Sequence, residues 1–233
     1  MNKLADIAAC VIIPTYNNSK TLKQIIDGVL SFSTGKDVIV INDGSTDDTI
    51  EILTQYKERI VLLHNKTNSG KGYSLRKGFK EAITRGFKNA ITIDSDGQHY
   101  PEDIAIMIEY ALKYPKTLLM GSRNMNQESV PGKCSFGNKF SNFWFWVETG
   151  QKLPDTQTGF RLYPLEALKK IKLYTSKFET EIEVIVKLAW QDVKIIPVNI
   201  RVLYDMKERV SHFRPFRDFT RISILNTYLV TLT

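Results

Sequence analysis

Short apolar runs alternate with longer amphipathic segments along the first half of the chain. Five runs rich in Val and Ile have the length and composition of buried strands, and they span residues 8–14, 37–42, 59–64, 89–94 and 117–122. The intervening segments are typical of helices and comprise Ser19–Leu30, Asp47–Tyr56, Lys71–Arg85 and Pro101–Tyr114. Apolar strands alternating with helices indicate an α/β fold, with a mostly parallel sheet covered on both faces.

The second half of the chain has a different character. Residues 139–150, KFSNFWFWVETG, are rich in aromatic side chains. We predict strands at 158–164 and 193–204, and Pro197 in the latter suits an edge strand or a bulge. Residues Glu179–Trp190 are typical of a helix with one apolar side. We therefore expect a domain over residues 1–213 and a basic amphipathic tail over 214–233.

Distinctive polar residues follow four of the predicted strands. They are found at residues 14–18 (PTYNN), 42–47 (NDGSTD), 94–98 (DSDGQ) and 121–124 (GSRN). Such residues also form ordinary turns, so one cluster alone would be weak evidence for a site. Ligands of open α/β sheets bind beyond the carboxyl ends of the strands. Four clusters at one edge therefore favour a shared binding site.

Asp94 and Asp96 stand one residue apart at the end of an apolar run. Side chains at i and i+2 of an extended segment point the same way, so two bare carboxylates there would repel one another. A divalent cation removes this conflict, and Mg²⁺ or Mn²⁺ prefers oxygen ligands such as these, with Gln98 as a further oxygen donor. The alternative is an Asp-Gly turn with a solvated second carboxylate.

The charge balance favours an anionic partner. The chain carries 32 Lys and Arg against 25 Asp and Glu, a net charge of +7. Nucleic acid is not expected, because no helix carries a dense basic stripe and no RNA-binding signature occurs. The P-loop and the dinucleotide-binding glycine motif are both missing from the sequence. Cys10 and Cys134 form no disulfide framework, and we see neither a signal peptide nor an apolar run of membrane-spanning length, which together indicate a cytoplasmic location.

These motifs together resemble the family 2 glycosyltransferases with the GT-A fold, and within them the dolichyl- or polyprenyl-phosphate sugar synthases. The resemblance runs from about Cys10 to Phe213. Its markers are VIIPTYNN, VINDGSTDDT, NSGKGYSLRKG, ITIDSDGQHYPEDI, GSRN, TGFRLYP and VSHF. It implies a mostly parallel, Rossmann-like sheet. A phosphatase that uses a D-x-D motif is the competing reading, but there the motif is expected near the N-terminus with Thr or Val after it.

The resemblance also implies roles for individual residues. Asp43 would accept hydrogen bonds from the nucleotide base, and Asp96 with Gln98 would bind the metal, Mg²⁺ or Mn²⁺. The nucleotide-binding set is Pro14, Tyr16, Asn17, Asp43, Lys71, Asp94, Ser95 and Ser211. The catalytic set is Asp94, Asp96, Arg123 on the acceptor side, and Arg214. Ser211-His212 departs from the Ser-Lys more common in the synthases, so Arg209 or Arg214 would supply the missing positive charge.

The expected function is metal-dependent, inverting transfer of a sugar from a UDP- or GDP-sugar to a polyprenyl or dolichyl phosphate. The departing diphosphate needs charge stabilisation, whereas a phosphate acceptor is already ionised and needs no base. An alternative acceptor, a glycolipid or saccharide hydroxyl, would need a general base. Glu179, Glu181 and Glu183 include the candidates, although Glu179 and Glu183 lie four residues apart and could equally form the solvated face of their helix. A non-catalytic nucleotide-sugar or lipid-binding module is the alternative of another class.

The tail is expected to face a membrane surface. Its arginines precede or lie within an apolar-rich segment in which Phe219, Ile222, Leu225, Tyr228 and Leu229 recur at helical spacing. The aromatic run 143–146 would add an interfacial contact. We therefore expect a protein peripheral to the cytoplasmic face of a membrane, held further by any residues beyond Thr233. The alternative is that the tail packs on the sheet and the aromatic side chains are core.

Overall fold

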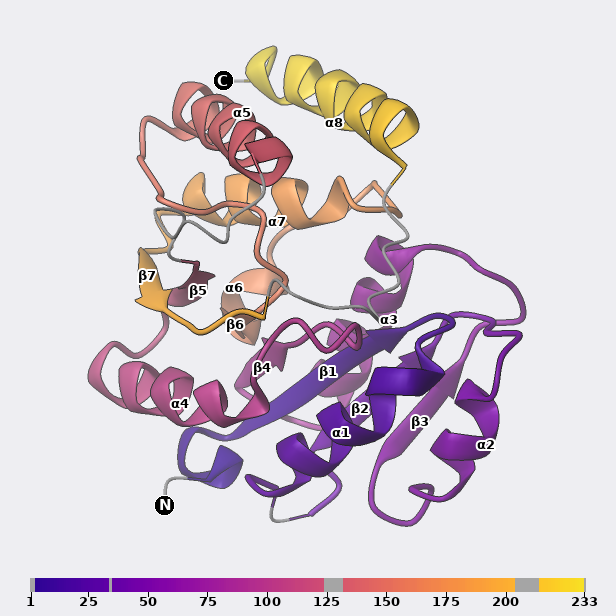
Figure 1. Ribbon diagram of the computed structural model, residues 1–233. Helices are drawn as coiled ribbons and strands as arrows, with labels where there is room; N and C mark the ends of the chain where they lie inside the picture. Colours follow the sequence, from indigo (N-terminus) through magenta and orange to yellow (C-terminus); the bar gives the residue numbers. More distant parts are fainter. Residues whose placement is uncertain (1–2, 34, 124–131, 204–213, 233) are drawn as a thin grey trace.

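The computed structural model describes residues 3–33, 35–123, 132–203 and 214–232. Its centre is a seven-stranded sheet in the order β3-β2-β1-β4-β6-β5-β7 (Figure 1). The strands are β1 (Ala9–Thr15), β2 (Val38–Asn42), β3 (Val61–His64), β4 (Asn89–Thr92), β5 (Leu118–Ser122), β6 (Arg161–Pro164) and β7 (Ile195–Asn199). The helices are α1 (Ser19–Leu30), α2 (Thr49–Thr54), α3 (Lys71–Thr84), α4 (Ile104–Lys113), α5 (Gly132–Thr149), α6 (Leu165–Leu168), α7 (Thr180–Ala189) and α8 (Pro215–Val230), with short 3-10 turns η1 (Leu4–Ile7) and η2 (Pro101–Asp103).

The strand directions place the polar strand ends at one edge. Strand β1 pairs in parallel with β2 and β4, and β2 pairs in parallel with β3. Strand β6 is antiparallel to both β4 and β5, so β5 runs in the same direction as β4. The mostly parallel sheet is thus confirmed. Strand β7 is an edge strand that pairs with β5, and Pro197 lies in it as predicted.

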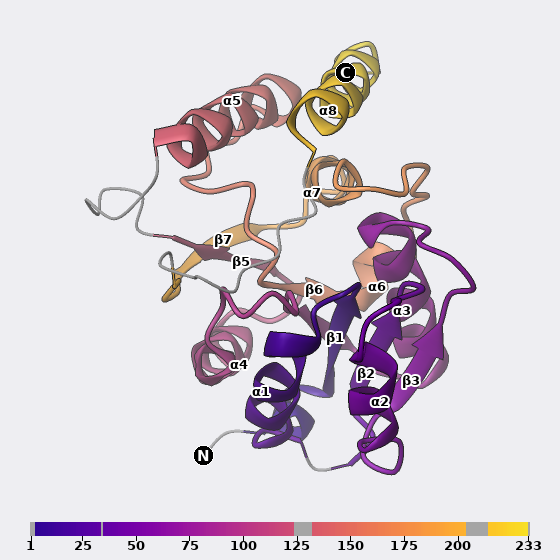
Figure 2. The same ribbon diagram turned by 45° about the vertical axis from the view of Figure 1, so that its right-hand side comes forward.

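Helices cover both faces of the sheet, as the sequence predicts. On one face, α1, α4 and η1 pack against Val11 and Ile13 of β1. On the other face, α3 and α7 pack against Cys10 and Ile12, the alternate residues of the same strand. Figure 2 shows these two layers on either side of the sheet. Burial raises the pKa of the Cys10 thiol far above its ordinary value, as expected for a structural cysteine.

Helices α5 and α8 lie side by side above α7 in both views (Figures 1 and 2). The aromatic run 143–146 belongs to α5, an element that the sequence pattern did not predict. Phe145 is fully buried, whereas Phe143 and Trp146 are 52% and 44% exposed. Phe219 of α8 contacts Phe140 of α5, with ring centroids 5.1 Å apart.

The expected apolar face of α8 is divided between the interior and the surface. Ile222, Leu225 and Leu229 are buried in the core shared with α5 and α7, so they pack within the molecule. Tyr228 remains exposed. In the part of the chain that the structure describes, no helix has the length and apolar character that a membrane span requires.

Candidate active site

The ends of β1 and β2 are joined by hydrogen bonds. The backbone N–H of Asn17 donates to Ser45 Oγ at 3.0 Å, and the backbone N–H of Thr46 donates to Asn17 Oδ1 at 2.8 Å. Asn17 adopts a left-handed conformation (φ 50°), which asparagine tolerates better than most residues. The partly exposed Tyr16 precedes it in the chain. Two polar clusters that lie 28 residues apart therefore form one surface.

The end of β4 is joined to the end of β1 in the same way. Asn18 Nδ2 donates to Ser95 Oγ at 2.8 Å, and Ser95 Oγ donates to the carbonyl oxygen of Pro14 at 3.1 Å. Thr21 Oγ1 donates to the carbonyl oxygen of Ser95 at 2.6 Å. The hydroxyl of Ser95 is thus committed to holding the turn after β4. Its predicted contact with a nucleotide stays a prediction.

Asp43, at the end of β2, is buried and organises the loop that leads into α3. Its Oδ1 accepts hydrogen bonds from Asn65 Nδ2 at 2.7 Å and from the backbone N–H of Ser69 at 2.9 Å. Its Oδ2 accepts one from the backbone N–H of Gly70 at 2.7 Å. Each carboxylate oxygen can accept more than one bond, so these contacts leave capacity for a nucleotide base. That base contact stays a prediction, and the loop contacts are a role the sequence did not predict.

Lys71, the first residue of α3, lies between two carboxylates. Its Nζ is 2.7 Å from Asp94 Oδ1, 2.9 Å from Asp94 Oδ2 and 2.9 Å from Glu181 Oε2 at the start of α7. Two glycines make room for this group. A Cβ on Gly72 would lie 1.9 Å from Thr180 Oγ1, and a Cβ on Gly159 would lie 2.3 Å from Asp94 Oδ2. The close approach of α3, α7 and the loop before β6 therefore requires both glycines.

The pKa values of this group follow from burial and charge. Burial alone would lower the pKa of Lys71, but Asp94 and Glu181 outweigh it and raise the pKa above its usual range. Burial alone would raise the pKa of Asp94, but Lys71 outweighs it and the pKa lies below its ordinary value. The ammonium and the carboxylate are therefore both charged at neutral pH.

Asp96 and Gln98 lie in the turn that follows Asp94. Asp96 Oδ1 accepts a hydrogen bond from the backbone N–H of Gln98 at 3.1 Å, and the Gln98 side chain is buried. The Asp96 carboxylate and the side-chain oxygen of Gln98 are ligand types that fit Mg²⁺ or Mn²⁺, which bind through one or two carboxylates together with substrate phosphates. Among the described residues, no group of three or more His, Cys, Asp and Glu side chains could hold a metal ion.

The same turn is fastened to the chain after β7. The backbone N–H of Leu203 donates to the carbonyl oxygen of Gln98 at 3.0 Å, and Arg201 Nη2 lies 2.7 Å from Asp103 Oδ1. His99 is buried, and its ring stacks on Phe160 at 5.6 Å between centroids. The strand predicted at 193–204 is shorter and spans Ile195–Asn199; in the described residues 200–203 only an isolated bridge follows, between Val202 and His99.

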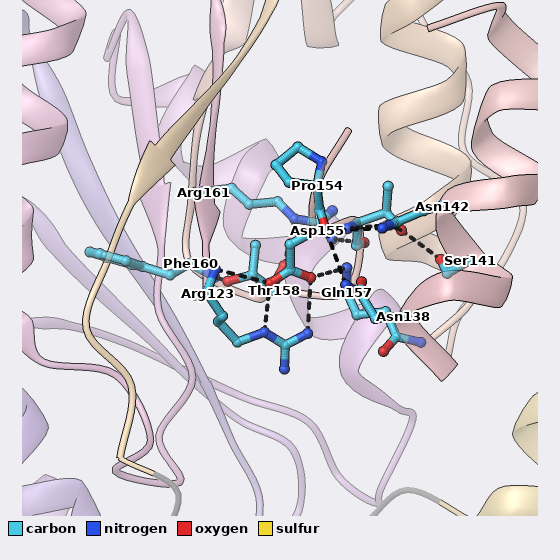
Figure 3. A network of polar contacts seen from close by, with 11 residues as sticks. Arg123, Asn138, Ser141, Asn142, Pro154, Asp155, Gln157, Thr158, Phe160 and Arg161 are labelled. Atoms are coloured by element: carbon cyan, nitrogen blue, oxygen red, sulfur yellow. Dashed lines mark hydrogen bonds and ion pairs between the residues drawn. The ribbon is translucent and has the colours of Figure 1, made fainter. Parts of the chain in front are cut away.

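Arg123 follows β5 and forms a bidentate ion pair with Asp155 (Figure 3). Its Nε is 2.6 Å from Asp155 Oδ2, its Nη2 is 2.9 Å from Oδ1, and its backbone N–H also donates to Oδ2 at 3.2 Å. Asp155 is buried, which alone would raise its pKa, but Arg123 outweighs burial and lowers the pKa. Asp155 was not singled out from the sequence. The only signal for it is its position just before the TGFRLYP marker.

The three glutamates near the start of α7 are all buried, so the expectation of a solvated helix face is wrong. Glu183 accepts hydrogen bonds from the backbone N–H groups of Tyr174 and Thr175 and forms an ion pair with Lys187. It therefore fixes the segment that precedes α7. Glu181 is held by Lys71, as described above. Glu181 and Glu183 can face the interior because each is paired with a donor from another segment. Glu179 accepts only a hydrogen bond of 3.3 Å from the backbone N–H of Lys177 among the described contacts, and its Oε2 is buried without a partner there.

The late basic region is described only from Arg214 onward. Arg214 precedes α8, where its backbone N–H donates to Asp218 Oδ2 at 2.6 Å and its side chain is exposed. Ser211, His212 and Arg209 lie outside the described residues. The predicted roles of Arg214 and Ser211 stay predictions.

Comparisons with known proteins identify the family of the chain. The family model described as "Glycosyl transferase family 2" matches residues 10–172. A UDP-N-acetylglucosamine–dolichyl-phosphate N-acetylglucosaminyltransferase of Methanococcus voltae is 28% identical over 221 residues, covering 86% of this chain and 88% of that protein. A polyprenol monophosphomannose synthase of Mycolicibacterium smegmatis is 29% identical over 170 residues, covering 70% of this chain and 64% of that protein.

A solved structure shares the fold. The glucosyl-3-phosphoglycerate synthase of Mycobacterium tuberculosis, in complex with Mn²⁺, UDP and phosphoglyceric acid, superposes with a TM-score of 0.71 at 19% identity, covering 97% of this chain and 78% of that one. The GT-A fold expected from the sequence is thereby confirmed. With the family model matching most of the chain, and with named relatives among the polyprenyl-phosphate sugar synthases, the chain belongs to glycosyl transferase family 2 and is a glycosyltransferase.

Proposed function

We propose that this enzyme transfers a sugar from a nucleoside diphosphate sugar, UDP- or GDP-linked, to a polyprenyl or dolichyl phosphate, with inversion and with a divalent metal ion. The observation that carries the proposal is the joined edge of the sheet, where the ends of β1, β2 and β4 meet beside Asp96 and Gln98. The relatives named for dolichyl phosphate and polyprenol substrates support the acceptor, and the structural neighbour bound to UDP and Mn²⁺ supports the donor and the metal.

Different residues would bind the metal ion and hold the groups around the donor site. Asp96 and Gln98 would hold Mg²⁺ or Mn²⁺, which stabilises the charge on a departing diphosphate. Lys71 holds Asp94 in one orientation, and Asp43 holds the loop 65–70 that borders the same edge. Fixed groups of this kind stabilise a transition state without reorganising during the reaction.

Two of the three candidate bases, Glu181 and Glu183, are held by other residues, which favours a phosphate acceptor over a hydroxyl acceptor. Glu181 is ion-paired with Lys71, and Glu183 is bonded to residues 174–175 and to Lys187. Groups held in this way serve poorly as a mobile general base. A phosphate acceptor is already ionised and needs no base, and the charge of Arg123, predicted for the acceptor side, is paired with Asp155.

The transfer assay tests this proposal directly. UDP- and GDP-sugars are incubated with a polyprenyl phosphate, with Mg²⁺ or with excess chelator, and the lipid product is measured. Asp96→Asn should abolish turnover, whereas Asp192→Asn, which alters an exposed aspartate away from the sheet edge, should not. Undiminished turnover in chelator, or transfer to a glycolipid hydroxyl with none to the lipid phosphate, would contradict the proposal.

We further propose that α5 and α8 face the membrane that holds the acceptor, with residues 214–233 as the membrane-facing tail on its cytoplasmic side. The exposed apolar residues of α5 and α8 include Phe143, Trp146, Ile224 and Tyr228, and Leu232, just after α8, is exposed too. Arg217 and Arg221 of α8 are exposed as well. Aromatic side chains suit the membrane interface, and each nearby basic residue adds about 1 kcal/mol of attraction to anionic lipid.

Point substitutions test the membrane contact better than truncation does, because Leu225 and Leu229 are buried and removing α8 would uncover the core. Ile224→Ser combined with Tyr228→Ser should reduce co-sedimentation with anionic vesicles. The matched control is Leu112→Ser on α4, whose side chain is 53% exposed on the other face of the sheet. Equal binding by the wild type and both variants would remove α8 from the membrane contact.

A further inference from the structure

Arg161, the first residue of β6, lies in an inner strand of the sheet, between β4 and β5, with its side chain fully buried. Its backbone pairs with Thr92 of β4 on one side and with Met120 of β5 on the other. Strand β4 leads to Asp94, and β5 leads to Arg123. Arg161 therefore lies between the strand that leads to Asp94, near the proposed metal ligands, and the strand that leads to Arg123, proposed for the acceptor.

The guanidinium of Arg161 bonds to backbone oxygens of two separate segments. Its Nε donates to the carbonyl oxygen of Thr158 at 2.7 Å, and its Nη2 donates to that of Thr156 at 3.0 Å (Figure 3). Its Nη1 donates to the carbonyl oxygen of Glu181 at 2.7 Å and to the Tyr163 hydroxyl at 3.2 Å. One planar group thus joins the loop 156–158 to the first turn of α7.

Each of these segments holds a charged residue of the site. The loop begins at Asp155, which accepts hydrogen bonds from Arg123 on both carboxylate oxygens. The first turn of α7 supplies the Glu181 carboxylate, which grips Lys71 and through it Asp94. The far side of the loop is fixed to α5, where Asn142 Oδ1 accepts a hydrogen bond from the backbone N–H of Thr156 at 3.0 Å.

We propose that Arg161 is a positioning residue of the transfer reaction. It fixes the position of the Arg123–Asp155 pair relative to the Asp94–Lys71–Glu181 group. The inference rests on the proposed function, in which Arg123 serves the acceptor and Asp94 the donor. Only an arginine suits the position, because the N–H donors of its rigid, planar guanidinium point in several directions within that plane. A lysine would keep the charge and concentrate its donors at one point.

The experiment compares Arg161→Lys with Arg76→Lys, an arginine that also donates to a backbone carbonyl, that of Leu173, but contacts neither segment. The readouts are kcat and KM for polyprenyl phosphate and the affinity for UDP. Arg161→Lys should lower kcat about 10- to 100-fold, the scale of a small misplacement of reacting groups, with UDP affinity changed much less. Arg76→Lys should change kcat by less than about twofold, since it leaves the relative position of the two groups intact.

A double-mutant cycle with Arg123→Lys separates positioning from a general structural role. If Arg161 acts through Arg123, the double variant should be no slower than Arg123→Lys alone by more than about twofold. Losses that multiply would overturn the inference. Should Arg161→Lys fail to fold, Tyr163→Phe, which removes a single acceptor, takes its place in the same cycle.

Amide hydrogen exchange tests the inference without any acceptor. Arg161→Lys should raise exchange at the backbone N–H of Gln157, which donates to Asp155 Oδ1, and of Phe160, while β1 stays protected. Unchanged exchange at both amides would overturn the inference. Raised exchange together with a wild type that transfers sugar to no polyprenyl phosphate would overturn the proposed function and leave the positioning role standing.

Discussion

Replacing Lys71 with methionine removes one buried positive charge from between two carboxylates. The side chains of Lys71, Asp94 and Glu181 are 16%, 25% and 11% exposed, so water can solvate the remaining charges only in part. Methionine retains most of the length and the apolar stem of lysine. The substitution therefore isolates the loss of the ammonium from the loss of packing.

The expected cost is about 3 kcal/mol of unfolding free energy. Breaking a buried ion pair by removing one partner costs roughly 3–5 kcal/mol, because the other charge is left uncompensated. We take the lower end because the Asp94 side chain is one quarter exposed. Lys169→Met is the matched control. Its ion pair with Glu166 is exposed to solvent, and pairs of that kind contribute little to stability.

Urea unfolding at several pH values measures both the size and the origin of the effect. Burial would raise the pKa of Asp94, but Lys71 outweighs burial and lowers it. A carboxyl with a lowered folded pKa contributes stability that is present above its unfolded pKa of about 3.9 and lost as the pH falls through the folded value. Without Lys71, burial raises the pKa of Asp94, and the variant regains stability as the pH falls through that raised value. The difference between the wild type and Lys71→Met should therefore be largest near neutral pH and shrink as the pH falls, beginning above about pH 4 and continuing below it.

Two results would refute this reasoning. One is a Lys71→Met variant as stable at pH 7 as Lys169→Met. The other is a stability difference that stays constant down to pH 2, which would show that packing and not charge was lost. A third variant, Lys71→Met combined with Asp94→Asn and Glu181→Gln, should recover part of the stability, because no uncompensated charge then remains buried.

Three further predictions follow from single groups. Asp43→Ala should weaken the binding of UDP or GDP, measured by calorimetry, by roughly 1.5–3 kcal/mol, the scale of hydrogen bonds to a charged group; unchanged affinity in a folded variant would contradict the base contact. Glu183→Gln should lower the unfolding free energy by about 2 kcal/mol in urea without changing nucleotide affinity, because Glu183 fixes residues 174–175; an altered affinity would place it in the site. Burial raises the pKa of Glu148 to about 8, so the folded state keeps a proton that the unfolded state releases above about pH 4.3. As the pH rises from about 4.3 to about 8, the stability of the wild type should therefore fall by about 1.4 kcal/mol per pH unit relative to Glu148→Gln. Parallel pH profiles of the two proteins would show that the carboxyl is not protonated in the fold.

The strands and their polar ends could be predicted because the apolar runs of the central strands are buried on both faces. The strands β1 and β2 are buried throughout, so their sequences read as continuous hydrophobic runs. The shared edge then follows from parallel pairing alone. The direction of β6 could not be predicted, because four residues carry no signal that distinguishes a parallel from an antiparallel neighbour.

Helix α5 was missed because its aromatic residues lie around the helix and not on one side. Phe145 points into the core, whereas Phe143 and Trp146 are exposed, which hides the helical period. The buried glutamates were misjudged for a different reason. An acidic residue is normally expected to be exposed to solvent. The partner that allows Glu181 to be buried, Lys71, lies on another segment and cannot be recognised from the local sequence. Asp155 was missed likewise, because its partner Arg123 lies 32 residues away.

These buried ion pairs determine which segments of the chain meet more than they add to the net free energy of unfolding. Taking two charges out of water costs about as much as their attraction returns, so each pair adds little to the free energy of the correct fold. A wrong register, however, leaves a buried carboxylate without its cation and is heavily penalised. Asp94–Lys71 joins β4 to α3, and Asp155–Arg123 joins the loop before β6 to β5. The charges therefore specify which segments meet at the sheet edge, where transfer requires their positions to be fixed.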